Sequence, residues 1–398
     1  MTEPPAIPTK MWALRRAAQL LADDARQRWR KVGPVGAQGV PLSPEQITED
    51  WLAAVLCADI PGARVESVRA GGSSVGTTTR STLELTYNGA GAGARLPTRL
   101  FVKCASTAPQ RLMLGLGGFI QNEPSFYAQV RPGLEIEAPM GYWGAVDGRS
   151  WHSIVLLEDV TATRGARFWK PATNLSRAQI EDLLSHVATW HGTLWDSPWL
   201  AAWRWLNTPG EQMRVVDALI GLADRRAAGA RRARAVIPST LRDRQADLFE
   251  GMRRAMELAS QGARTYLHGD LHIANTYRTR DQKLGIADWQ VGLQGSWAFD
   301  YAYLLATALK VEDRRSWEHD LLDFYLDQLA AAGGGQIRRA EAWQAYRQAT
   351  LYPYFAWTYT LGRSRLQPRF QPDQVSLVMI ERIAAAIEDL DSLGAVGL

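Results

Sequence analysis

The segment YLHGDLHIAN, residues 266–275, places several polar side chains among apolar residues on one short stretch. Buried polar groups cost free energy unless each finds a hydrogen-bond partner, so such a cluster needs a chemical reason. Asp270 and Asn275 have the D-x-x-x-x-N spacing of a phosphotransfer catalytic loop. In such a loop the aspartate accepts or orients the proton of the acceptor hydroxyl, and the asparagine turns back toward a magnesium ion. The segment therefore predicts a phosphotransfer active site.

A further acidic residue follows at a spacing that suits the same chemistry. Asp288 lies in IADWQ, residues 286–290, where it leaves a short apolar strand thirteen positions after Asn275. A carboxylate is a hard oxygen ligand, suited to a magnesium ion that bridges nucleotide phosphates. Asn275 and Asp288 are therefore the predicted ligands of Mg²⁺.

Three upstream features occur in the order that a kinase requires. AGGSSVGTTTR, residues 70–80, is a glycine- and hydroxyl-rich turn whose backbone N–H groups can cover phosphate oxygens. Lys103 ends the strand-like LFVK, where its ammonium group can neutralise the α- and β-phosphates of ATP. Glu123 follows in a helix-like segment, where it can pair with Lys103. The phosphate-binding candidates in the turn are Gly72, Ser73, Ser74 and Gly76.

The segment LLEDV, residues 156–160, leaves the last strand-like run where a hinge between two lobes is expected. The adenine of ATP would hydrogen-bond to backbone groups of this hinge, with apolar side chains beside it. The expected cofactor-binding residues are Leu157, Glu158, Asp159 and Val160. Together with the loop, these parts predict an enzyme that uses ATP and Mg²⁺.

The residue pattern predicts an α+β fold with two lobes of different character. From residue 63 to residue 160 the sequence alternates and is rich in β-branched residues, which is typical of strands. A five-stranded antiparallel sheet carrying one helix is the economical arrangement. After residue 160 the pattern is almost wholly helical, interrupted only at residues 264–292. The predicted strands lie within residues 63–70, 79–87, 97–104, 138–146 and 150–160, and the helix within residues 117–130.

An N-terminal extension precedes the sheet. In residues 10–31 four apolar positions recur at helical spacing with charges on the other face, namely Leu14, Ala18, Leu21 and Ala25. Ser43 is expected to cap a second helix that holds Trp51. The extension is expected to pack against the small lobe, with dimerisation as the alternative. The expected parts are an extension at 1–60, a nucleotide-binding N-lobe at 61–157, a hinge at 158–161 and a helical C-lobe with the acceptor pocket at 162–398.

The composition is that of a globular protein, with 46% hydrophobic and 22% charged residues. A net charge of +4 suits an anionic ligand without demanding nucleic acid, and the basic run at 224–244 lacks aromatic residues that would stack on bases. No apolar stretch approaches the roughly 20 residues that a bilayer requires, so no membrane partner is expected. Only Cys57 and Cys104 are present, which favours the reducing cytoplasm. We expect a monomer or homodimer whose partner is a small-molecule hydroxyl substrate.

The loop motifs resemble those of a known superfamily. HGDLHIAN followed by IADWQ resembles the HGDxHxxN and I-D-[FW]-x signatures of the aminoglycoside phosphotransferase-like superfamily, a branch of the protein-kinase-like fold. NEPSFYAQV, LLEDV and HGTLW (191–195) are similar to its ecdysteroid kinase-like subgroup. The resemblance covers about residues 60–310 and implies a bilobal fold in which magnesium-ATP phosphorylates the hydroxyl group of a small molecule.

The resemblance also implies roles for single residues. His272 would order the loop, and Asp300 in FDYAYLL would brace the loop from the next helix. Asp288 is followed by Trp289 and Gln290 rather than Phe-Gly, and no Ala-Pro-Glu motif follows, so the activation segment of protein kinases is not indicated. By resemblance Asp270 would be the catalytic base, Asn275 and Asp288 the magnesium ligands, and Lys103 and Glu123 the phosphate-anchoring pair.

Three other functions compete with phosphotransfer to a small molecule, and one of them, a protein kinase, is weakened by the missing activation segment. His268, Asp270 and His272 form H-x-D-x-H, which could supply the ligands of a metal-dependent hydrolase. That function leaves Asn275 and Lys103 without roles. A catalytically silent nucleotide-binding module is the second competitor, although every charged group that the chemistry needs is present.

The acceptor is expected to bind in the helical lobe, facing Asp270. This lobe is rich in aromatic residues, for example in LYPYFAWTY at 351–359, some of which can line an apolar pocket. A polycationic aminoglycoside would need clustered acidic residues, and the acidic runs at 318–328 and 387–391 have the periodicity of helix surfaces. The expected acceptor is a neutral or apolar alcohol resembling a steroid, lipid, macrolide or hydroxyacyl compound, with aminoglycoside O-phosphorylation as the alternative.

Overall fold

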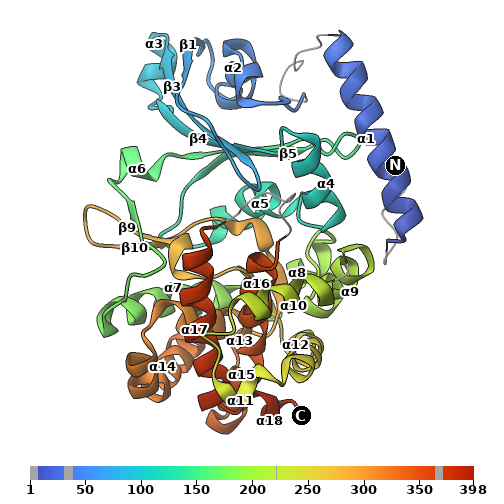
Figure 1. Cartoon of the computed structure of the whole chain (residues 1–398). Helices are drawn as coiled ribbons and strands as arrows, with labels where there is room; N and C mark the ends of the chain where they lie inside the picture. The colour runs from blue at the N-terminus through green and yellow to red at the C-terminus, as the bar shows by residue number, and fades with distance from the viewer. Residues whose placement is uncertain (1–7, 31–38, 221, 364–370) are drawn as a thin grey trace. The chain divides into compact units, whose positions relative to one another are not determined.

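The computed structural model describes residues 8–30, 39–220, 222–363 and 371–398 (Figure 1). The expectations for residues 1–7 and 31–38 lie outside these ranges. The chain divides into two compact units, one formed by Met1–Gly133 and Pro139–Ala166 and the other by Leu134–Ala138 and Arg167–Leu398. The first unit holds a sheet and the second is mostly helical. The α+β class with a small sheet-bearing part and a larger helical part is therefore confirmed.

The first unit is built on an antiparallel sheet with the strand order β1-β3-β4-β6-β5. The five predicted strands are all present, and a two-residue strand, β2 (Ser74–Val75), pairs with β3 at the edge of the glycine-rich turn. The main strands are β1 (Val65–Ala70), β3 (Thr79–Tyr87), β4 (Arg99–Cys104), β5 (Gly141–Val146) and β6 (Ser153–Glu158).

The register of the sheet separates two faces. Lys103 lies opposite Arg80 on β3 and opposite Val155 on β6, so these side chains share one face. The alternate positions point to the other face, which is covered by α2 (Glu49–Leu56). Burying each large apolar side chain there contributes about 1.5–3 kcal/mol. The core on this face includes Trp51, Leu52, Leu83, Leu85, Leu100, Val102, Ile154 and Leu156.

The cap of α2 differs from the prediction. Ser43 instead precedes a short 3₁₀ helix, Pro44–Gln46, and makes no capping hydrogen bond with its side chain. Thr48 caps α2, because its hydroxyl accepts a hydrogen bond from the Trp51 N–H at 3.2 Å. Pro44 supplies a fixed φ angle one residue after Ser43, so the chain turns there before the longer helix begins.

Helix α1 (Lys10–Arg30) turns a different face to the protein than its apolar stripe suggests. Leu20 is fully buried, whereas Leu14 and Leu21 are 67% and 54% exposed. Leu20 packs in a cluster with Trp151 and with residues of α4 (Ala108–Leu116). Arg16 donates hydrogen bonds of 2.8 Å to the carbonyls of Gly148 and Arg149. Polar contacts of this kind hold the helix in its observed rotation.

The predicted helix at 117–130 begins later than expected. Gly117 caps α4 and Gly118 has a φ of 78°, a left-handed conformation that ends helices. The chain then forms α5 (Asn122–Ser125), a π-helical turn (Phe126–Val130) and a 3₁₀ turn (Arg131–Gly133). Helix α4 was not predicted; it begins at a capping box formed by Thr107 and Gln110. Two small helices complete the unit, α3 (Gly89–Gly93) and α6 (Val160–Thr163).

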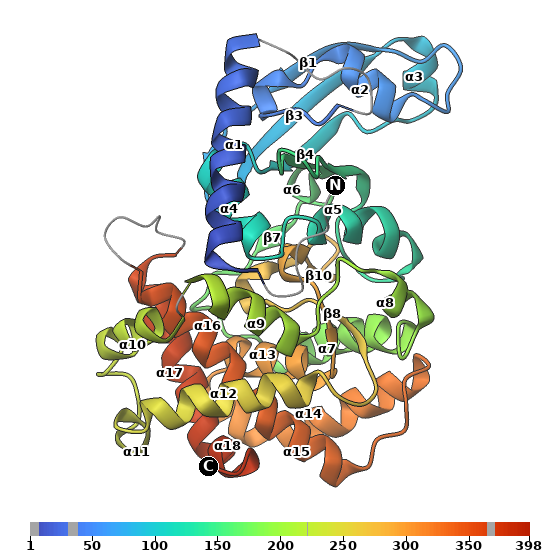
Figure 2. The same cartoon turned by 90° about the vertical axis from the view of Figure 1, so that its right-hand side faces the viewer.

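The second unit surrounds α13 (Ala298–Ala308), a helix whose residues are all buried (Figure 2). Short antiparallel strands flank the loop at residues 268–275: β9 (Thr276–Arg278) pairs with β7 (Arg167–Phe168) and β10 (Leu284–Ile286), and β8 (Thr265–Leu267) pairs with β11 (Leu293–Gly295). Within the described residues, no helix combines the length and apolar character needed to cross a membrane. The other main helices are α7 (Arg177–Thr193), α9 (Pro209–Ile220), α10 (Leu222–Arg232), α12 (Gln245–Ala259), α14 (Val311–Ala331), α15 (Arg339–Ala349), α16 (Leu351–Leu361) and α17 (Asp373–Asp389), with short α8 (Pro198–Ala202), α11 (Ser239–Arg242) and α18 (Ser392–Ala395).

Candidate active site

The catalytic loop of the second unit connects β8 to a 3₁₀ turn, Ile273–Asn275. Gly269 in this loop has a φ of 79°, and a Cβ atom there would lie 2.2 Å from the carbonyl oxygen of Val291. Only glycine fits both the left-handed conformation and the close approach. The glycine of the HGD motif is thus needed to bring Asp270 into place.

The carboxylate of Asp270 is held by one of its two oxygens. Tyr303 on α13 donates a hydrogen bond of 2.7 Å to Oδ1. Oδ2 lies 3.7 Å from Nε2 of His272, too far for a hydrogen bond. The Asp270 side chain is 36% exposed, so it remains accessible. The arrangement fixes the direction of the carboxylate while leaving Oδ2 able to accept a proton.

Asp300 braces the backbone of the loop. Its Oδ2 accepts a hydrogen bond of 2.6 Å from the His268 N–H, and its Oδ1 accepts one of 2.9 Å from the Gly269 N–H. His191 on α7 lies 3.3 Å from Oδ2 through Nε2, and Tyr325 on α14 lies 2.7 Å from its Nδ1. Burial lowers the pKa of His191, so the ring is neutral, accepts from Tyr325 and donates to Asp300. His191 and Tyr325 were not identified as site residues from the sequence.

Asn275 and Asp288 lie at the same end of one hairpin. Thr276 of β9 pairs with Ile286 of β10, and the Ala287 N–H donates a hydrogen bond of 2.9 Å to the Asn275 carbonyl. The thirteen positions that separate Asn275 from Asp288 are therefore spanned by this hairpin. Asp288 has φ 69° and ψ 62°, an uncommon conformation for a residue other than glycine that tends to occur at functional sites.

These two side chains suit a magnesium ion. Asn275 Nδ2 donates a hydrogen bond of 2.9 Å to the Asp270 carbonyl, so its Oδ1 points away from that contact. An amide oxygen and a carboxylate are hard ligands, and Mg²⁺ commonly takes one or two such groups together with phosphate oxygens and water. In the described ranges, no three histidine, cysteine or acidic side chains converge as an all-protein metal cage. The donor set fits an ion that arrives with a nucleotide.

The histidines of H-x-D-x-H are already engaged. His268 accepts a hydrogen bond of 3.2 Å from the Asp270 N–H through Nδ1 and donates one of 3.1 Å to the Ala287 carbonyl through Nε2. His272 accepts from the Ala274 N–H at 3.2 Å through Nδ1. Burial lowers the pKa of His272, which keeps the ring neutral. Because both nitrogens of His268 are occupied, the metal-dependent hydrolase finds no support in this geometry.

The first unit contains the Lys103–Glu123 pair. Lys103 Nζ lies 2.7 Å and 2.6 Å from the two carboxylate oxygens of Glu123, and each side chain is only 5% exposed. Glu123 belongs to α5, which lies next to the sheet. The pairing predicted from the sequence is present.

The glycine-rich turn is tied to α4. Ser74 pairs with Arg80 and so lies on the Lys103 face of the sheet. The Gly76 carbonyl accepts a hydrogen bond of 3.0 Å from Nε2 of Gln110, a buried side chain that also completes the capping box of α4. The role of Gln110 was not predicted, although the T-x-x-Q spacing of Thr107 and Gln110 is the recognisable signal of that cap. Gly72 and Ser73 lie in the connection before β2.

In the LLEDV segment, Leu157 lies on the same face of the sheet as Lys103, and the two acidic side chains make contacts that stabilise the segment. Leu157 pairs with Phe101, two residues from Lys103 on the same face. The Glu158 N–H donates to the Met140 carbonyl at 2.8 Å, and its carboxylate binds Arg164 at 2.5 Å. Asp159 caps α6, where it accepts from the Ala162 N–H at 3.2 Å, and Val160 is the buried first residue of that helix. The side chains of Glu158 and Asp159 thus stabilise this segment.

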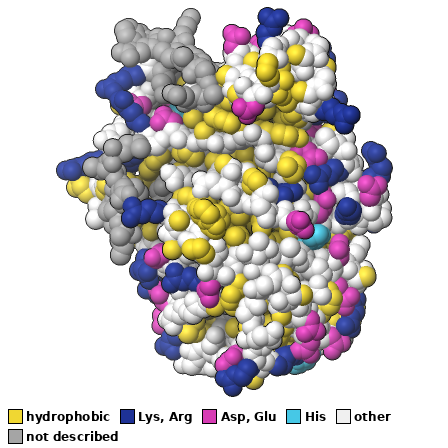
Figure 3. All heavy atoms as spheres, turned by 180° about the vertical axis from the view of Figure 1, so that it is seen from behind, with side chains coloured by type: hydrophobic (Ala, Val, Ile, Leu, Met, Phe, Trp, Pro, Cys, Tyr) yellow, Lys and Arg dark blue, Asp and Glu magenta, His cyan; other side chains and the backbone are white. Residues whose placement is uncertain are grey.

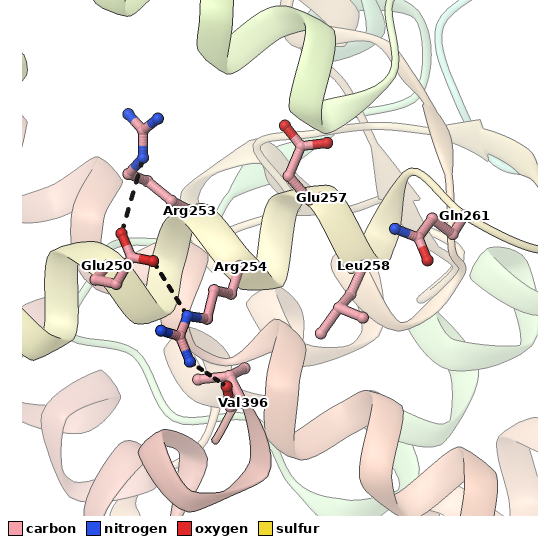
Figure 4. A pocket seen from close by; sticks show the side chains of 7 residues that line it. All are labelled: Glu250, Arg253, Arg254, Glu257, Leu258, Gln261 and Val396. Atoms are coloured by element: carbon pink, nitrogen blue, oxygen red, sulfur yellow. Dashed lines mark hydrogen bonds and ion pairs between the residues drawn. The ribbon is translucent and has the colours of Figure 1, made fainter. Parts of the chain in front are cut away.

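A surface depression on α12 is unsuited to catalysis (Figure 4). Its charged side chains are ion-paired: Glu250 with Arg254 at 3.1 Å, and Glu257 with Arg214 at 2.5 Å. On the face seen in Figure 3, acidic and basic side chains are interspersed over the helical unit in the lower part of the picture, without a large block of one sign on the part that is described. Neither feature adds a candidate site.

The architecture of the two units and the loop geometry define the class of protein: the chain is a kinase-type phosphotransferase of the protein-kinase-like fold. Within that class, residues 214–333 match the model of the ecdysteroid kinase-like family. The matched segment contains the catalytic loop, Asp288 and Asp300, so the resemblance seen in the motifs is confirmed. No curated protein matches the chain.

Solved structures similar to the chain include three phosphotransferases. The choline kinase LicA from Streptococcus pneumoniae is 14% identical, with 82% of this chain and 94% of that one covered and a TM-score of 0.44. An aminoglycoside phosphotransferase from Streptomyces rimosus is 17% identical, with 72% and 92% covered and a TM-score of 0.40. A macrolide 2'-phosphotransferase from Brachybacterium faecium is 15% identical, with 84% and 95% covered and a TM-score of 0.39. Since these scores lie below 0.5, the assignment of the class rests on this chain's own architecture and motifs.

Proposed function

We propose that this chain transfers the γ-phosphoryl group of magnesium-ATP to the hydroxyl group of a neutral or apolar small molecule. The observation that carries the proposal is the state of Asp270: Tyr303 holds Oδ1 at 2.7 Å, while the side chain remains 36% exposed. A carboxylate fixed in direction but still accessible is what a general base for an incoming hydroxyl requires. Asn275 Nδ2 ties the magnesium-binding end of the loop to the same residue through the Asp270 carbonyl.

In the proposed step the acceptor hydroxyl gives its proton to Asp270 Oδ2 as its oxygen forms a bond to the γ-phosphorus. The bond between the γ-phosphorus and the β,γ-bridging oxygen breaks, and ADP leaves with that oxygen. Asn275 and Asp288 would hold Mg²⁺, which neutralises phosphate charge when bound. Lys103, fixed by Glu123, would bind the α- and β-phosphates.

The side chains near Asp270 in the second unit favour an apolar acceptor. Tyr352 on α16 donates a hydrogen bond of 3.3 Å to the Gly269 carbonyl, and the Trp357 ring lies 5.3 Å from the ring of His272. Aromatic side chains beside the loop suit flat or aliphatic alcohols better than a polycation.

Carboxylates in the two acidic runs that could attract an aminoglycoside form ion pairs with arginines of this chain. Asp320 binds Arg177 at 3.1 Å, and Glu318 binds Arg314 at 2.6 Å. Asp389 binds Arg315 at 2.7 Å. Carboxylates that are neutralised in this way are poor partners for ammonium groups of a ligand.

The test is an ADP-release assay with magnesium-ATP and a library of sterols, hydroxyacyl compounds, macrolides and aminoglycosides. Turnover of an apolar alcohol that disappears in Asp270→Asn is the expected result. Asp320→Asn changes an exposed carboxylate that is remote from the chemistry and serves as the matched control. Selective turnover of an aminoglycoside overturns the acceptor class, and turnover that survives in Asp270→Asn overturns the role of the base.

A further inference from the structure

We infer that Tyr303 is a positioning residue that aligns the catalytic carboxylate of Asp270 and keeps it ready to accept a proton. This inference rests on the proposed function and adds to it a residue that the loop motifs do not contain. Tyr303 lies on α13, outside the loop, and reaches the loop only through the tertiary structure.

Asp300 and Tyr303 act from one face of α13. They are three residues apart, so their side chains project to the same side of the helix. Asp300 accepts from the backbone N–H of Gly269 at 2.9 Å, and Tyr303 donates to the side chain of the following residue, Asp270, at 2.7 Å. One helix therefore fixes both the backbone of the loop and the direction of its carboxylate. Since every residue of α13 is buried, packing prevents the helix from rotating away from the loop.

The phenol of Tyr303 is a permanent donor. The side chain is 1% exposed, and its ring lies 5.9 Å from that of Tyr352 and 6.3 Å from that of His272. Burial, followed by the nearby Asp270 carboxylate, raises the pKa of Tyr303 well above its ordinary value. The phenol therefore keeps its proton near neutral pH and donates it in the hydrogen bond to Asp270 Oδ1.

Other titratable groups surround Asp270 and remain unchanged in the test. His272 lies 3.7 Å away on the loop, and Tyr352 approaches from α16. His268, Asp288 and Asp300 are further ionisable side chains of this neighbourhood. Removal of the Tyr303 hydroxyl takes away the charge-assisted hydrogen bond that fixes the direction of the Asp270 carboxylate.

The experiment compares Tyr303→Phe with Tyr301→Phe. Tyr301 lies on the same helix, is equally buried and donates its hydroxyl to the Glu318 carbonyl at 3.4 Å, so it controls for the loss of a buried phenol. The readout is ADP release from magnesium-ATP with water as the acceptor, resolved into kcat and the KM for ATP. A merely structural role of the phenol would change stability without this selective effect on kcat.

In Tyr303→Phe we expect kcat to fall about tenfold with the KM for ATP unchanged, because the carboxylate loses its alignment while the nucleotide still binds. Tyr301→Phe should leave both kcat and the KM for ATP as in the native chain. A native kcat in Tyr303→Phe, or an equal fall of kcat in Tyr301→Phe, overturns the inference. A native rate of ADP release in Asp270→Asn overturns the proposed function, whereas a native rate confined to Tyr303→Phe overturns this inference alone.

A second measurement covers the case in which Tyr303→Phe does not fold. Incorporation of 3-fluorotyrosine at position 303 makes the phenol a stronger donor without removing it. The kcat of ADP release should then depart from the native value, whereas 3-fluorotyrosine at position 301 should leave it unchanged. An unchanged kcat with the label at position 303 overturns the inference.

Discussion

His191 and Asp300 meet inside the helical unit, with His191 Nε2 lying 3.3 Å from Asp300 Oδ2 and both side chains fully buried. The carboxylate also accepts the N–H groups of His268 and Gly269, so one buried charge satisfies three donors. Tyr325 lies 2.7 Å from the other nitrogen of His191 and fixes the tautomer of the ring. The catalytic loop is thus supported by a chain of partners from three different helices.

Asp300→Asn should weaken both folding and catalysis. An amide can accept one of the two backbone N–H groups but presents its own donors to the other, which leaves a buried group unsatisfied. We expect the free energy of unfolding in urea to fall by about 2–4 kcal/mol. The expected fall in kcat is about a hundredfold, since small displacements of a catalytic group cost that much. Asp320→Asn, which changes an exposed carboxylate, should leave both quantities close to native.

Glu123→Gln should destabilise the first unit, because it removes the negative charge that pairs with the buried Lys103 ammonium group. The expected loss is about 3–5 kcal/mol, measured by urea unfolding. The double variant Lys103→Met with Glu123→Leu should recover most of the stability while remaining inactive. Glu84→Gln breaks the exposed pair with Arg99 and should cost under about 1 kcal/mol. Full activity of the double variant would contradict a role of Lys103 in binding phosphate.

Gln110 should affect the affinity for ATP through the glycine-rich turn. Gln110→Glu keeps the oxygen that accepts from Ser106 N–H and Thr107 N–H at 3.1 Å but loses the donor to the Gly76 carbonyl. We expect the KM for ATP to rise several-fold with stability nearly unchanged. Gln110→Ala removes the capping contacts as well and should cost about 1 kcal/mol of stability in addition. A native KM in both variants would show that the turn needs no tether.

Helix α1 provides a matched pair of leucines. Leu20→Ala removes a fully buried side chain and should cost about 2–5 kcal/mol in urea unfolding. Leu14→Ala changes a side chain that is 67% exposed and should stay within about 0.5 kcal/mol of the native chain. Equal losses at the two positions would mean that α1 packs by its apolar stripe instead.

His152 should make the stability of the first unit depend on pH. Burial, reinforced by the nearby Arg111, lowers the pKa of His152 to about 4 from an ordinary 6.5. The unfolded chain therefore binds the proton more readily, so stability is complete above about pH 6.5 and falls as the pH drops toward 4. The loss across this window is on the order of 3 kcal/mol. His152→Asn should flatten this part of the profile of unfolding free energy against pH, and an equally steep profile in the variant would refute the assignment.

The catalytic motifs could be predicted because they are local. Asp270 and Asn275 share one short loop, and a single hairpin connects Asn275 to Asp288. Because these connections are short, residues that are near in the sequence are also near in the structure. The strands of the first unit were predictable for the same reason, since alternation reports one buried face directly. The pairing of Lys103 with Glu123 could be predicted because Lys103 lies near the end of the third main strand and Glu123 lies in the helical segment that comes after it.

The supporting residues could not be predicted in this way. Tyr303, His191 and Tyr325 are themselves buried, and in the sequence a buried tyrosine or histidine looks like any other core side chain. Which of them meets the loop depends on how the helices pack. The face that α1 turns toward the protein could not be predicted either. It depends on the hydrogen bond from Arg16 to the Gly148 carbonyl and on the packing of Leu20 with Trp151, which the apolar periodicity does not reveal.

The sequence by itself determined the candidate site: a carboxylate, an amide and a second carboxylate at fixed separations on a loop and hairpin, because short-range geometry follows from the covalent chain. Only the tertiary structure decided how that carboxylate is aimed. Its direction comes from Tyr303, and Asp300, whose bracing role the family resemblance implied, is itself held by His191 from a helix distant in the chain. The contacts of Tyr303 and His191 are selected by burial and shape across the whole unit, and no local pattern records them.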